Sequence, residues 1–317
     1  DNKLMSVLIT GSAGFIGYHL SKKLLNDNIH VHGVDNLNNY YDVKLKKDRT
    51  NDLKKNKKFN FYKTDLCEFK KLDKIIKKNK IKYVIHLAAQ AGVRYSIKNP
   101  RAYFESNLEG FFNILELSKI NKIKHLIFAS TSSVYGDTKK FPLNENDSTD
   151  HPLSFYAATK KSNEIMAHSY SYIHNLPCTG VRFFTVYGPF GRPDMALFKF
   201  TKNIIENKHI ELYNNGNHSR DFTYVDDIIV GISSLLKKQP NKKIPYEIYN
   251  IGNGNPKKLL DYLKTIEKNL KKSAKTKKLP LQIGDIFKTH SDIKKLKIST
   301  GYIPKTSIDV GIRKFIE

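Results

Sequence analysis

The sequence predicts an α/β fold with a doubly wound parallel sheet and a smaller, less regular α/β unit toward the C-terminal end. Three observations support this class. Short apolar runs typical of buried strands alternate with longer amphipathic segments over the first 184 residues. A glycine-rich turn separates the first apolar run from the first amphipathic segment. After residue 184 the alternation loosens, and Tyr187–Pro193 is rich in Gly and Pro.

The N-terminal half begins with three elements that can be assigned from their pattern. Met5–Thr10 is apolar and is followed by Gly11, as expected for a strand. Gly14–Asn26 carries its large apolar residues at helical spacing, and His30–Asp35 is a short strand that ends at an acidic residue. Further strands are expected at Phe59–Tyr62, Tyr83–Ala88, His125–Ala129 and Thr179–Phe184, and helices at Phe69–Lys78, Arg101–Ile120 and Phe155–His174. Such alternation implies βαβ units and a parallel sheet.

The C-terminal half is expected to be more irregular. Helices are expected at Ala196–Glu206, Val225–Lys237 and Pro256–Leu270, strands at Ile210–Tyr213 and Glu247–Ile251, and loops at Tyr187–Pro193 and at the charge run Lys271–Lys278. We expect a first domain formed by residues 1–183 with a return segment at about 224–250. A second, smaller domain is expected from residues 184–223 and 251–317.

The chain is strongly basic, with 55 Lys and Arg against 30 Asp and Glu and a formal charge of +25. Clustered cations can bind nucleic-acid backbones, so this charge invites that interpretation. Only seven of the cations are Arg, the residue that favours base readout and bidentate phosphate contacts. The lysines, such as Lys44, Lys46 and Lys47, follow helix-face spacing and predict solvated faces. We expect no nucleic-acid partner, although the charge can attract an anionic small molecule.

Several classes of protein are disfavoured by the sequence. No apolar run approaches the roughly 20 residues that cross a bilayer, so no membrane association is expected. A strand-like run begins at Met5 and leaves no room for a signal peptide, which predicts a cytoplasmic protein. Cys67 and Cys178 cannot form a disulfide scaffold or a thiolate site, and the histidines show no ligand spacing, so no metal is expected.

The turn GSAGFIG at Gly11–Gly17 has the features of a phosphate-binding turn. Glycines let the backbone approach a pyrophosphate, and the N-terminus of the following helix supplies amide donors. Asp35 ends the second strand, where a carboxylate can accept hydrogen bonds from an adenosine ribose. No cation follows it directly, since Asn36, Leu37 and Asn38 come next. We therefore expect NAD rather than NADP; the alternative is a glycine-rich turn with no ligand.

Tyr156 and Lys160 lie one helical turn apart, so the phenol and the ammonium share a helix face. A nearby cation favours the phenolate, and such a tyrosine can act as a base near neutral pH. The spacing alone occurs four times in this lysine-rich chain. Tyr156 differs because the hydroxyl run Ser130–Ser133 ends the preceding strand, at the edge where parallel sheets bind ligands. The alternative is a surface tyrosine and a Ser-rich strand end.

Together these segments resemble the nucleotide-sugar epimerases of the extended short-chain dehydrogenase/reductase family, whose first domain is of Rossmann type. The similarity spans nearly the whole chain. The segments that narrow it to UDP-glucuronate 4-epimerases are His86–Ser96, Tyr156–His168, Thr179–Phe200 and Ser219–Asp227, with GPFGRPDM (Gly188–Met195) as a specific signature. The resemblance implies a tightly held NAD, a UDP-sugar substrate and a homodimer formed through the helices near residues 101–120 and 155–174.

The resemblance also implies roles for individual residues. Tyr156 would take the proton of the sugar 4-hydroxyl, Lys160 would hold the nicotinamide ribose and lower the pKa of Tyr156, and Thr131 would bind the 4-oxygen. The implied cofactor-binding residues are Gly11, Ala13, Gly14, Phe15, Ile16, Gly17, Asp35, Asn36, Asp65, Leu66, Leu87, Ala88, Ala89 and Lys160. The implied substrate-binding residues are Ser132, Ser133, Thr185, Arg192, Arg220 and Arg94. The implied reaction is epimerisation at C4 of UDP-glucuronate to UDP-galacturonate through a transient 4-keto sugar.

A uronate substrate places a physical requirement on this site. Oxidation at C4 creates a β-keto acid, which loses CO₂ readily, so the carboxylate must be held while the ring turns over. Hydroxyl donors with a guanidinium suit this task, because Arg can bind a carboxylate through two hydrogen bonds. By the resemblance, Thr185 and Arg192 belong to this group, while Arg220 and Arg94 are expected at the UDP pyrophosphate. Each arginine could instead be a plain surface cation.

Related enzymes remain as alternatives. A 4,6-dehydratase needs an acid/base carboxylate pair after Thr131, and a UDP-glucuronate decarboxylase typically has Glu at Ser133, whereas this chain has Ser132-Ser133. A UDP-glucose/UDP-galactose 4-epimerase is the main alternative, although it has no need of Thr185 and Arg192. A non-catalytic nucleotide- or nucleic-acid-binding module is a more distant one, since it has no use for the Tyr156 phenol.

Overall fold

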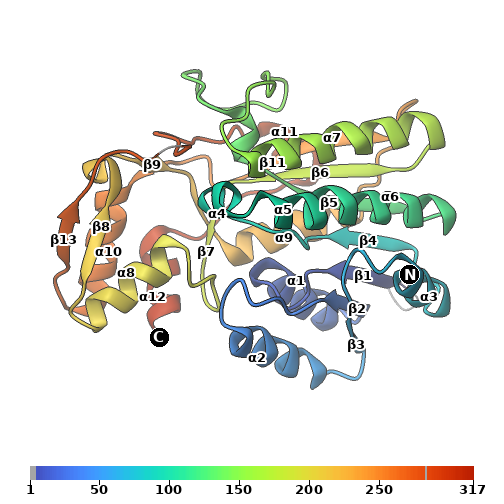
Figure 1. Ribbon diagram of the computed structural model, residues 1–317, viewed down its shortest axis with the longest axis horizontal. Helices are drawn as coiled ribbons and strands as arrows, with labels where there is room; N and C mark the ends of the chain where they lie inside the picture. Colours follow the sequence, from blue (N-terminus) through green and yellow to red (C-terminus); the bar gives the residue numbers. More distant parts are fainter. Residues whose placement is uncertain (1–4, 283) are drawn as a thin grey trace.

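A parallel sheet forms the centre of the larger unit of the molecule (Figure 1). The computed structural model describes residues 5–282 and 284–317. Over these residues the sheet has seven strands in the order β11-β6-β5-β4-β1-β2-β3. The strands are β1 (Ser6–Thr10), β2 (His30–Asp35), β3 (Phe59–Lys63), β4 (Tyr83–His86), β5 (His125–Thr131), β6 (Cys178–Phe183) and β11 (Tyr246–Ile251). The order runs outward from β1 in both directions, which places a topological switch point between β1 and β4.

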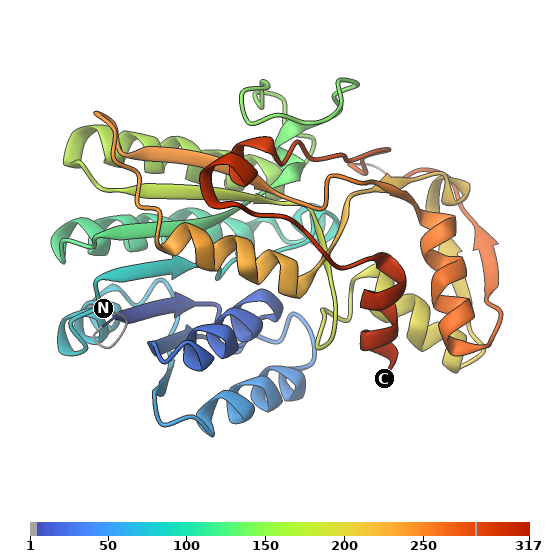
Figure 2. The ribbon, with the colours of Figure 1, turned by 180° about the vertical axis from the view of Figure 1, so that it is seen from behind.

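Helices cover both faces of the sheet (Figures 1 and 2). On one face lie α1 (Phe15–Asn26) and α9 (Val225–Leu236), with α2 (Val43–Lys54) beside α1, and on the other lie α3 (Phe69–Lys78), α6 (Gly110–Ile120) and α7 (Phe155–His174). Alternating side chains of β1 serve both layers. Val7 and Ile9 belong to the apolar cluster of α1 and α9, whereas Leu8 belongs to the cluster of α3 and α6. This two-sided burial explains the continuous apolar run at the start of the chain.

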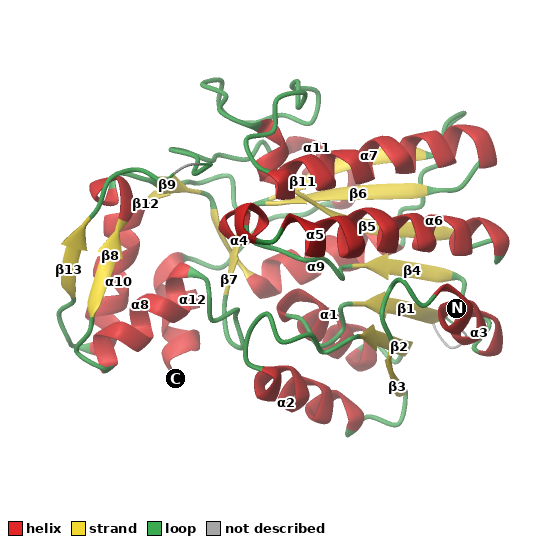
Figure 3. Ribbon diagram, in the orientation of Figure 1, coloured by secondary structure: helices red, strands yellow, loops and turns green. Residues whose placement is uncertain are grey.

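A smaller unit stands at one end of the sheet (Figure 3). It contains the parallel pair β8 (His209–Leu212) and β13 (Lys275–Lys278) with α8 (Ala196–Ile205), α10 (Leu259–Leu270) and α12 (Ile308–Ile316). Two pairs of short strands lie between this unit and the larger one. In the first, β7 (Thr185–Tyr187) pairs with β10 (Phe222–Tyr224), and in the second, β9 (Ser219–Arg220) pairs with β12 (Lys257–Lys258). The remaining elements are α4 (Val93–Lys98), α5 (Pro100–Tyr103), η2 (Phe104–Glu109), η3 (Ser132–Tyr135), η4 (Tyr213–Gly216) and α11 (Lys294–Thr300).

The fold class is confirmed, and three element predictions need correction. The helix expected at Pro256–Leu270 begins at Leu259, because Lys257–Lys258 forms strand β12. The expected helix at 101–120 is interrupted, because Phe104–Glu109 forms a π-helical segment between α5 and α6. The charge run expected as a loop contains strand β13, whose four residues are exposed and pair in parallel with β8. A strand without a buried face has no apolar alternation, so the pattern could not indicate it. None of the described helices combines the length and hydropathy required to cross a membrane.

Candidate active site

A cavity of about 1430 Å³ opens at the carboxyl ends of the parallel strands and extends between the sheet and the smaller unit. Its lining includes every predicted site residue except Ala13. Ala13 is buried below the cavity surface, where its N–H donates to the Asp35 carboxylate at 3.1 Å and its carbonyl accepts from Arg49 at 2.9 Å. The fold therefore brings together residues that lie up to 209 positions apart in the sequence, from Gly11 to Arg220.

The glycine turn between β1 and α1 lines one end of the cavity and fits a pyrophosphate. Gly11 has a φ of +74°, and a Cβ on it would lie 2.7 Å from the Ala88 nitrogen. A Cβ on Gly17 would lie 2.0 Å from the Gly11 carbonyl oxygen. Helix α1 can therefore pack this close to the turn only because residue 17 is Gly. In the described chain, no side chain caps the N-terminus of α1 at Gly14. Its amide donors are thus available for an anion at the cavity wall.

Asp35 is fixed at the end of β2 by main-chain donors. Its carboxylate accepts from the N–H groups of Ala13 at 3.1 Å and Leu37 at 2.8 Å. Burial raises the pKa of this carboxyl, while those hydrogen bonds and the charges of Lys46 and Arg49 oppose the shift. Next to it, the Asn36 amide donates to Asp65 at 2.7 Å, which joins the ends of β2 and β3. This set of acceptors and amides suits an adenosine ribose.

Lys46 is an exception to the expected solvated lysines. Its side chain is buried and lines the cavity, and its ammonium donates to the Asn38 carbonyl and side-chain oxygens, both at 2.7 Å. The ammonium also lies 4.5 Å from the centroid of the Tyr41 ring. Lys46 lies on α2, 11 residues after Asp35, and its side chain lines the cavity. Sequence reasoning considered only the residues directly after Asp35 and therefore did not identify this cation.

The Tyr156 and Lys160 side chains project from α7 into the same cavity. The Lys160 ammonium donates to the Ala129 carbonyl at the end of β5, at 3.0 Å, and burial lowers its pKa to about 8. Burial raises the pKa of the Tyr156 phenol, while the Thr131 side chain and the charge of Arg192 oppose that rise. The lowering of the Tyr156 pKa by Lys160 stays a prediction, because the causes that oppose the rise here are Thr131 and Arg192.

The predicted hydroxyl groups lie along two strand ends. Thr131 ends β5 and caps the η3 turn by accepting from the Ser133 N–H at 3.2 Å; its hydroxyl also donates to the Ser133 hydroxyl at 3.3 Å. Ser132 and Ser133 continue this wall of the cavity. Thr185 begins β7, two residues after β6 ends, and also lines the cavity. Because β5 and β6 are neighbours, the hydroxyl groups line one continuous edge of the sheet.

Arg192 lies near the reacting end of the cavity but already has a carboxylate partner. Its Nε donates to Asp194 Oδ1 at 3.0 Å, and its Nη2 donates to Asp194 Oδ2. The Tyr40 hydroxyl donates to the same carboxylate at 3.3 Å. The carboxylate raises the pKa of the guanidinium against its burial, and the guanidinium holds the pKa of Asp194 below its usual value. Sequence reasoning missed Asp194, although it lies two residues after Arg192.

Arg94 and Arg220 meet at the other end of the cavity. Arg220 donates to Asp285 at 2.9 Å, and Arg94 lies 4.0 Å from the same carboxylate and 4.7 Å from the centroid of the Tyr213 ring. The buried His218 imidazole is 3.4 Å from Asp285. Two guanidinium groups around one carboxylate leave a net positive end of the cavity, which suits a diphosphate. Among the described residues, no group of three or more His, Cys, Asp or Glu side chains could hold a metal ion.

The glycine turn for a dinucleotide, the Tyr156 and Lys160 side chains of α7 and the Thr131 hydroxyl at the end of β5 line one cavity. This combination defines an enzyme of the nucleotide-dependent short-chain dehydrogenase/reductase class. Residues 7–252 match the model of the NAD dependent epimerase/dehydratase family. The chain belongs to that family, and it is an isomerase that uses NAD.

Individual relatives are similar over almost the whole chain. Protein CapI of Staphylococcus aureus is 50% identical, over 99% of this chain and 98% of that protein. The probable UDP-glucuronate 4-epimerase of Rhizobium meliloti is 43% identical, over 99% and 96% of the two chains. The crystal structure of the UDP-glucuronic acid 4-epimerase from Bacillus cereus, in complex with UDP-glucuronic acid and NAD, superposes with a TM-score of 0.92. The two proteins are 36% identical in sequence, and the superposition covers 98% of each chain.

Proposed function

We propose that this enzyme interconverts UDP-glucuronate and UDP-galacturonate by NAD-dependent epimerisation at C4. The observation that carries the proposal is the edge of hydroxyl groups from Thr131 to Ser133 and Thr185, together with Arg192, beside the Tyr156 phenol. No carboxylate side chain stands directly after Thr131, where a dehydratase or decarboxylase needs its acid/base group. The similarity to the Rhizobium meliloti and Bacillus cereus proteins supports the same substrate.

The cavity has the parts that NAD requires. The glycine turn and the free N-terminus of α1 would hold the pyrophosphate, and Asp35 with Asn36 would hold the adenosine ribose. Asp65 and Leu66 would border the adenine, while Leu87–Ala89 would follow the nucleotide toward Lys160. When bound, the nicotinamide would accept a hydride from C4 of the sugar and return it to the opposite face of the ring.

Tyr156 would move the matching proton. As hydride leaves C4, the phenolate takes the proton of the 4-hydroxyl, and the phenol gives it back when the 4-keto sugar is reduced. Burial raises the pKa of the phenol, so the base must be generated by nearby positive charge. Arg192 supplies part of that charge, and the Lys160 ammonium on the next turn of α7 would supply more. Thr131 would hold the 4-oxygen in both half-reactions.

The two ends of the substrate would be held differently. Arg220 and Arg94 would bind the diphosphate, with Asp285 fixing their positions. Ser132, Ser133 and Thr185 would donate to the hexuronate carboxylate, and Arg192 would pair with it. Holding the carboxylate in the plane of the ring would oppose loss of CO₂ from the β-keto acid, because decarboxylation needs the C–C bond aligned with the carbonyl π system.

The decisive experiment is incubation of the purified enzyme with UDP-glucuronate and, separately, with UDP-glucose, followed by proton NMR. We expect UDP-galacturonate as the product and no UDP-pentose. Turnover of UDP-glucose alone would contradict the uronate substrate, and UDP-pentose would indicate a decarboxylase. Tyr156→Phe should keep its bound NAD and lose at least about 1,000-fold in kcat; full activity in that variant would contradict the mechanism.

We further propose that the molecule is a homodimer and that the two domains predicted from the sequence divide the labour between NAD and UDP-sugar. Helices α6 and α7 lie side by side and expose apolar side chains, including Ile165, Tyr172 and Ile173, each about 60% exposed or more. A second copy would cover this surface. A monomer mass by light scattering at micromolar concentration would contradict the dimer. We propose a cytoplasmic location, which suits the free Cys67 and Cys178 thiols.

A further inference from the structure

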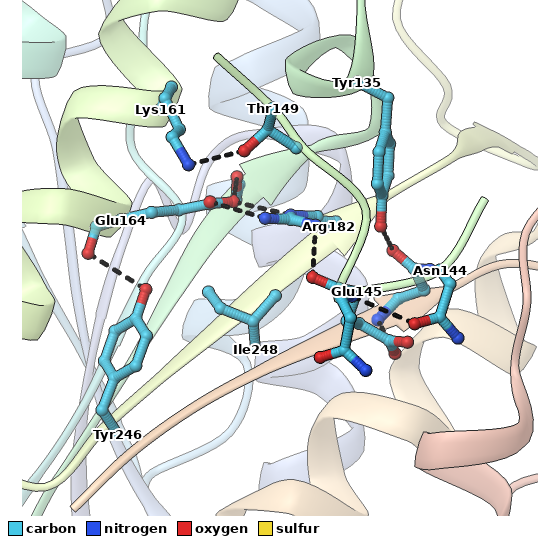
Figure 4. Close-up of polar contacts among 12 residues, drawn as sticks. Tyr135, Asn144, Glu145, Thr149, Lys161, Glu164, Arg182, Tyr246 and Ile248 are labelled. Atoms are coloured by element: carbon cyan, nitrogen blue, oxygen red, sulfur yellow. Dashed lines mark hydrogen bonds and ion pairs between the residues drawn. The ribbon is translucent and has the colours of Figure 1, made fainter. Parts of the chain in front are cut away.

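A buried ion pair joins Glu164 of α7 to Arg182 of β6 (Figure 4). The Arg182 Nε and Nη2 atoms donate to the two carboxylate oxygens of Glu164 at 2.9 and 2.8 Å, and both side chains are only 4% exposed. The Ser130 hydroxyl donates to the same carboxylate at 2.6 Å. The carboxylate therefore receives three hydrogen bonds from two strands and is fully satisfied.

These partners connect the elements that carry the reacting groups. Glu164 lies on α7, one turn after Lys160 and two turns after Tyr156. Ser130 on β5 immediately precedes Thr131, and in the sheet register it lies opposite Arg182 on β6. The Lys160 ammonium is bonded to the residue before Ser130. Two successive turns of α7 are thus bonded to two successive residues at the end of β5.

Further contacts hold the pair from the side away from the cavity. The Arg182 guanidinium lies 4.7 Å from the centroid of the Tyr135 ring, and its Nη1 donates to the Glu145 carbonyl at 3.3 Å. The Tyr246 hydroxyl of β11 donates to the Glu164 carbonyl at 3.0 Å (Figure 4). Burial of two charges is a poor means of gaining stability, since apolar residues of similar volume do as well. Directional bonds are instead suited to fixing one register.

We infer that Glu164, with Arg182 and Ser130, is a positioning residue that sets the register of α7 against β5 and β6 and so holds the Tyr156 phenol beside the Thr131 hydroxyl. The inference rests on the proposed function for its kinetic consequences. Its geometric content does not depend on the substrate, because Tyr156 and Thr131 line the same cavity and the Thr131 side chain opposes the rise of the Tyr156 pKa. If the helix moves the phenol away from Thr131, this effect weakens and the phenol pKa rises.

Two variants and one control test the inference. Glu164→Gln keeps the side-chain length and removes the charge, whereas Ser130→Ala removes only the bond to β5 and leaves both charges in place. Leu235→Ala is the control, because Leu235 is a fully buried residue of α9, on the face of the sheet opposite α7, and its truncation lowers stability without touching the network. The unfolding midpoint, kcat and KM for UDP-glucuronate are measured for each. The Tyr156 pKa is measured by NMR with ¹³Cζ-labelled tyrosine, and Tyr156→Phe identifies the signal.

We expect both network variants to lose about 10- to 100-fold in kcat with KM changed less than about threefold, and to show a higher Tyr156 pKa than the wild type. Leu235→Ala should lower the unfolding midpoint and leave kcat and the phenol pKa unchanged. The inference would be overturned if the folded Ser130→Ala variant had the same Tyr156 pKa as the wild type. It would also be overturned if Leu235→Ala lost as much kcat as the network variants. If Glu164→Gln does not fold, Ser130→Ala alone decides. If the wild type does not convert UDP-glucuronate, the proposed function fails while the phenol pKa still tests the positioning.

Discussion

At the scale of single residues, Arg192 has the environment that bears most directly on substrate choice. Its guanidinium is held by two hydrogen bonds to Asp194 and lies close enough to lower the Tyr156 pKa. A substrate carboxylate that pairs with Arg192 must share the guanidinium with Asp194 or displace it. The negative charge of Asp194 therefore weakens uronate binding and also weakens the effect of Arg192 on the phenol.

This arrangement predicts the behaviour of Asp194→Asn. The amide keeps a hydrogen-bond acceptor for Arg192 and removes the competing charge, so we expect KM for UDP-glucuronate to fall about three- to tenfold. Because Arg192 then acts more fully on Tyr156, the acidic limb of the pH profile of kcat should move to lower pH. Steady-state kinetics from pH 5.5 to 9 measure both effects. A higher KM, with Arg192→Lys giving the same increase, would show instead that Asp194 serves only to hold the guanidinium in place.

Several of these residues could be predicted from the sequence, and the others could not for physical reasons. The placement of Gly11 and Asp35 at the cavity was predictable from local spacing, and that of Tyr156 from the hydroxyl run that ends the preceding strand. Lys46 was not, since its burial depends on the path of α2 and its residue type is the commonest cation of this chain. The Glu164–Arg182 pair was also hidden, because i+4 spacing on a helix says nothing about a partner on a distant strand.

At the scale of elements, the turn between β1 and α1 makes the strictest demand on residue type. A Cβ at Gly17 would meet the Gly11 carbonyl oxygen at 2.0 Å and the Ser12 Cα at 3.0 Å, both main-chain atoms that cannot move without displacing α1. Gly17→Ala should therefore push the helix N-terminus away from the pyrophosphate. We expect at least about a 30-fold loss of NAD affinity, measured by calorimetric titration of nucleotide-free protein.

A glycine elsewhere separates lost affinity from lost stability. Gly301 follows α11 with a φ of +74°, and a Cβ there would meet nothing within 4 Å. Gly301→Ala should cost about 1 kcal/mol of unfolding free energy through backbone strain alone and leave NAD affinity unchanged. If both variants lowered NAD affinity equally, the steric argument for the turn would be wrong.

Elements were predictable where both sequence periodicity and burial were strong. The strands of the central sheet are buried on both faces and so appear as apolar runs, whereas exposed β13 gives no such signal. The π-helical segment at Phe104–Glu109 also gave none, because an extra residue in one helical turn barely changes the spacing of apolar side chains. The short strands β7 and β10 depend on contacts between the two units of the molecule and have no pattern of their own.

At the scale of the whole molecule, the formal charge of +25 explains less than the burial of a few ionisable groups. In the described part of the chain, six lysines pair with a carboxylate three or four residues away, as Lys23 does with Asp27, and such exposed pairs contribute little to stability. By contrast, His32, His86 and His125 lie buried in β2, β4 and β5. Burial lowers their pKa values to about 4, about 3 and about 4, so the folded sheet keeps all three neutral.

The direction of the resulting pH dependence follows from proton counting. Below the unfolded histidine pKa of 6.5, these three histidines bind up to three protons in the unfolded chain that they do not bind in the folded chain. The free energy of unfolding therefore decreases as the pH falls from 7 toward 4. Each histidine should contribute about 1.4 kcal/mol per pH unit, which gives on the order of 4 kcal/mol per unit for the three. Urea unfolding at pH 7, 6 and 5 measures this slope. His86→Gln can keep the hydrogen bond to Thr10 and should remove about 1.4 kcal/mol per pH unit from the slope, whereas His209→Gln, at an exposed position, should leave it intact. A free energy of unfolding that stays constant from pH 7 to 5 would mean that the three imidazoles are protonated inside the sheet, and the account of its core would then fail.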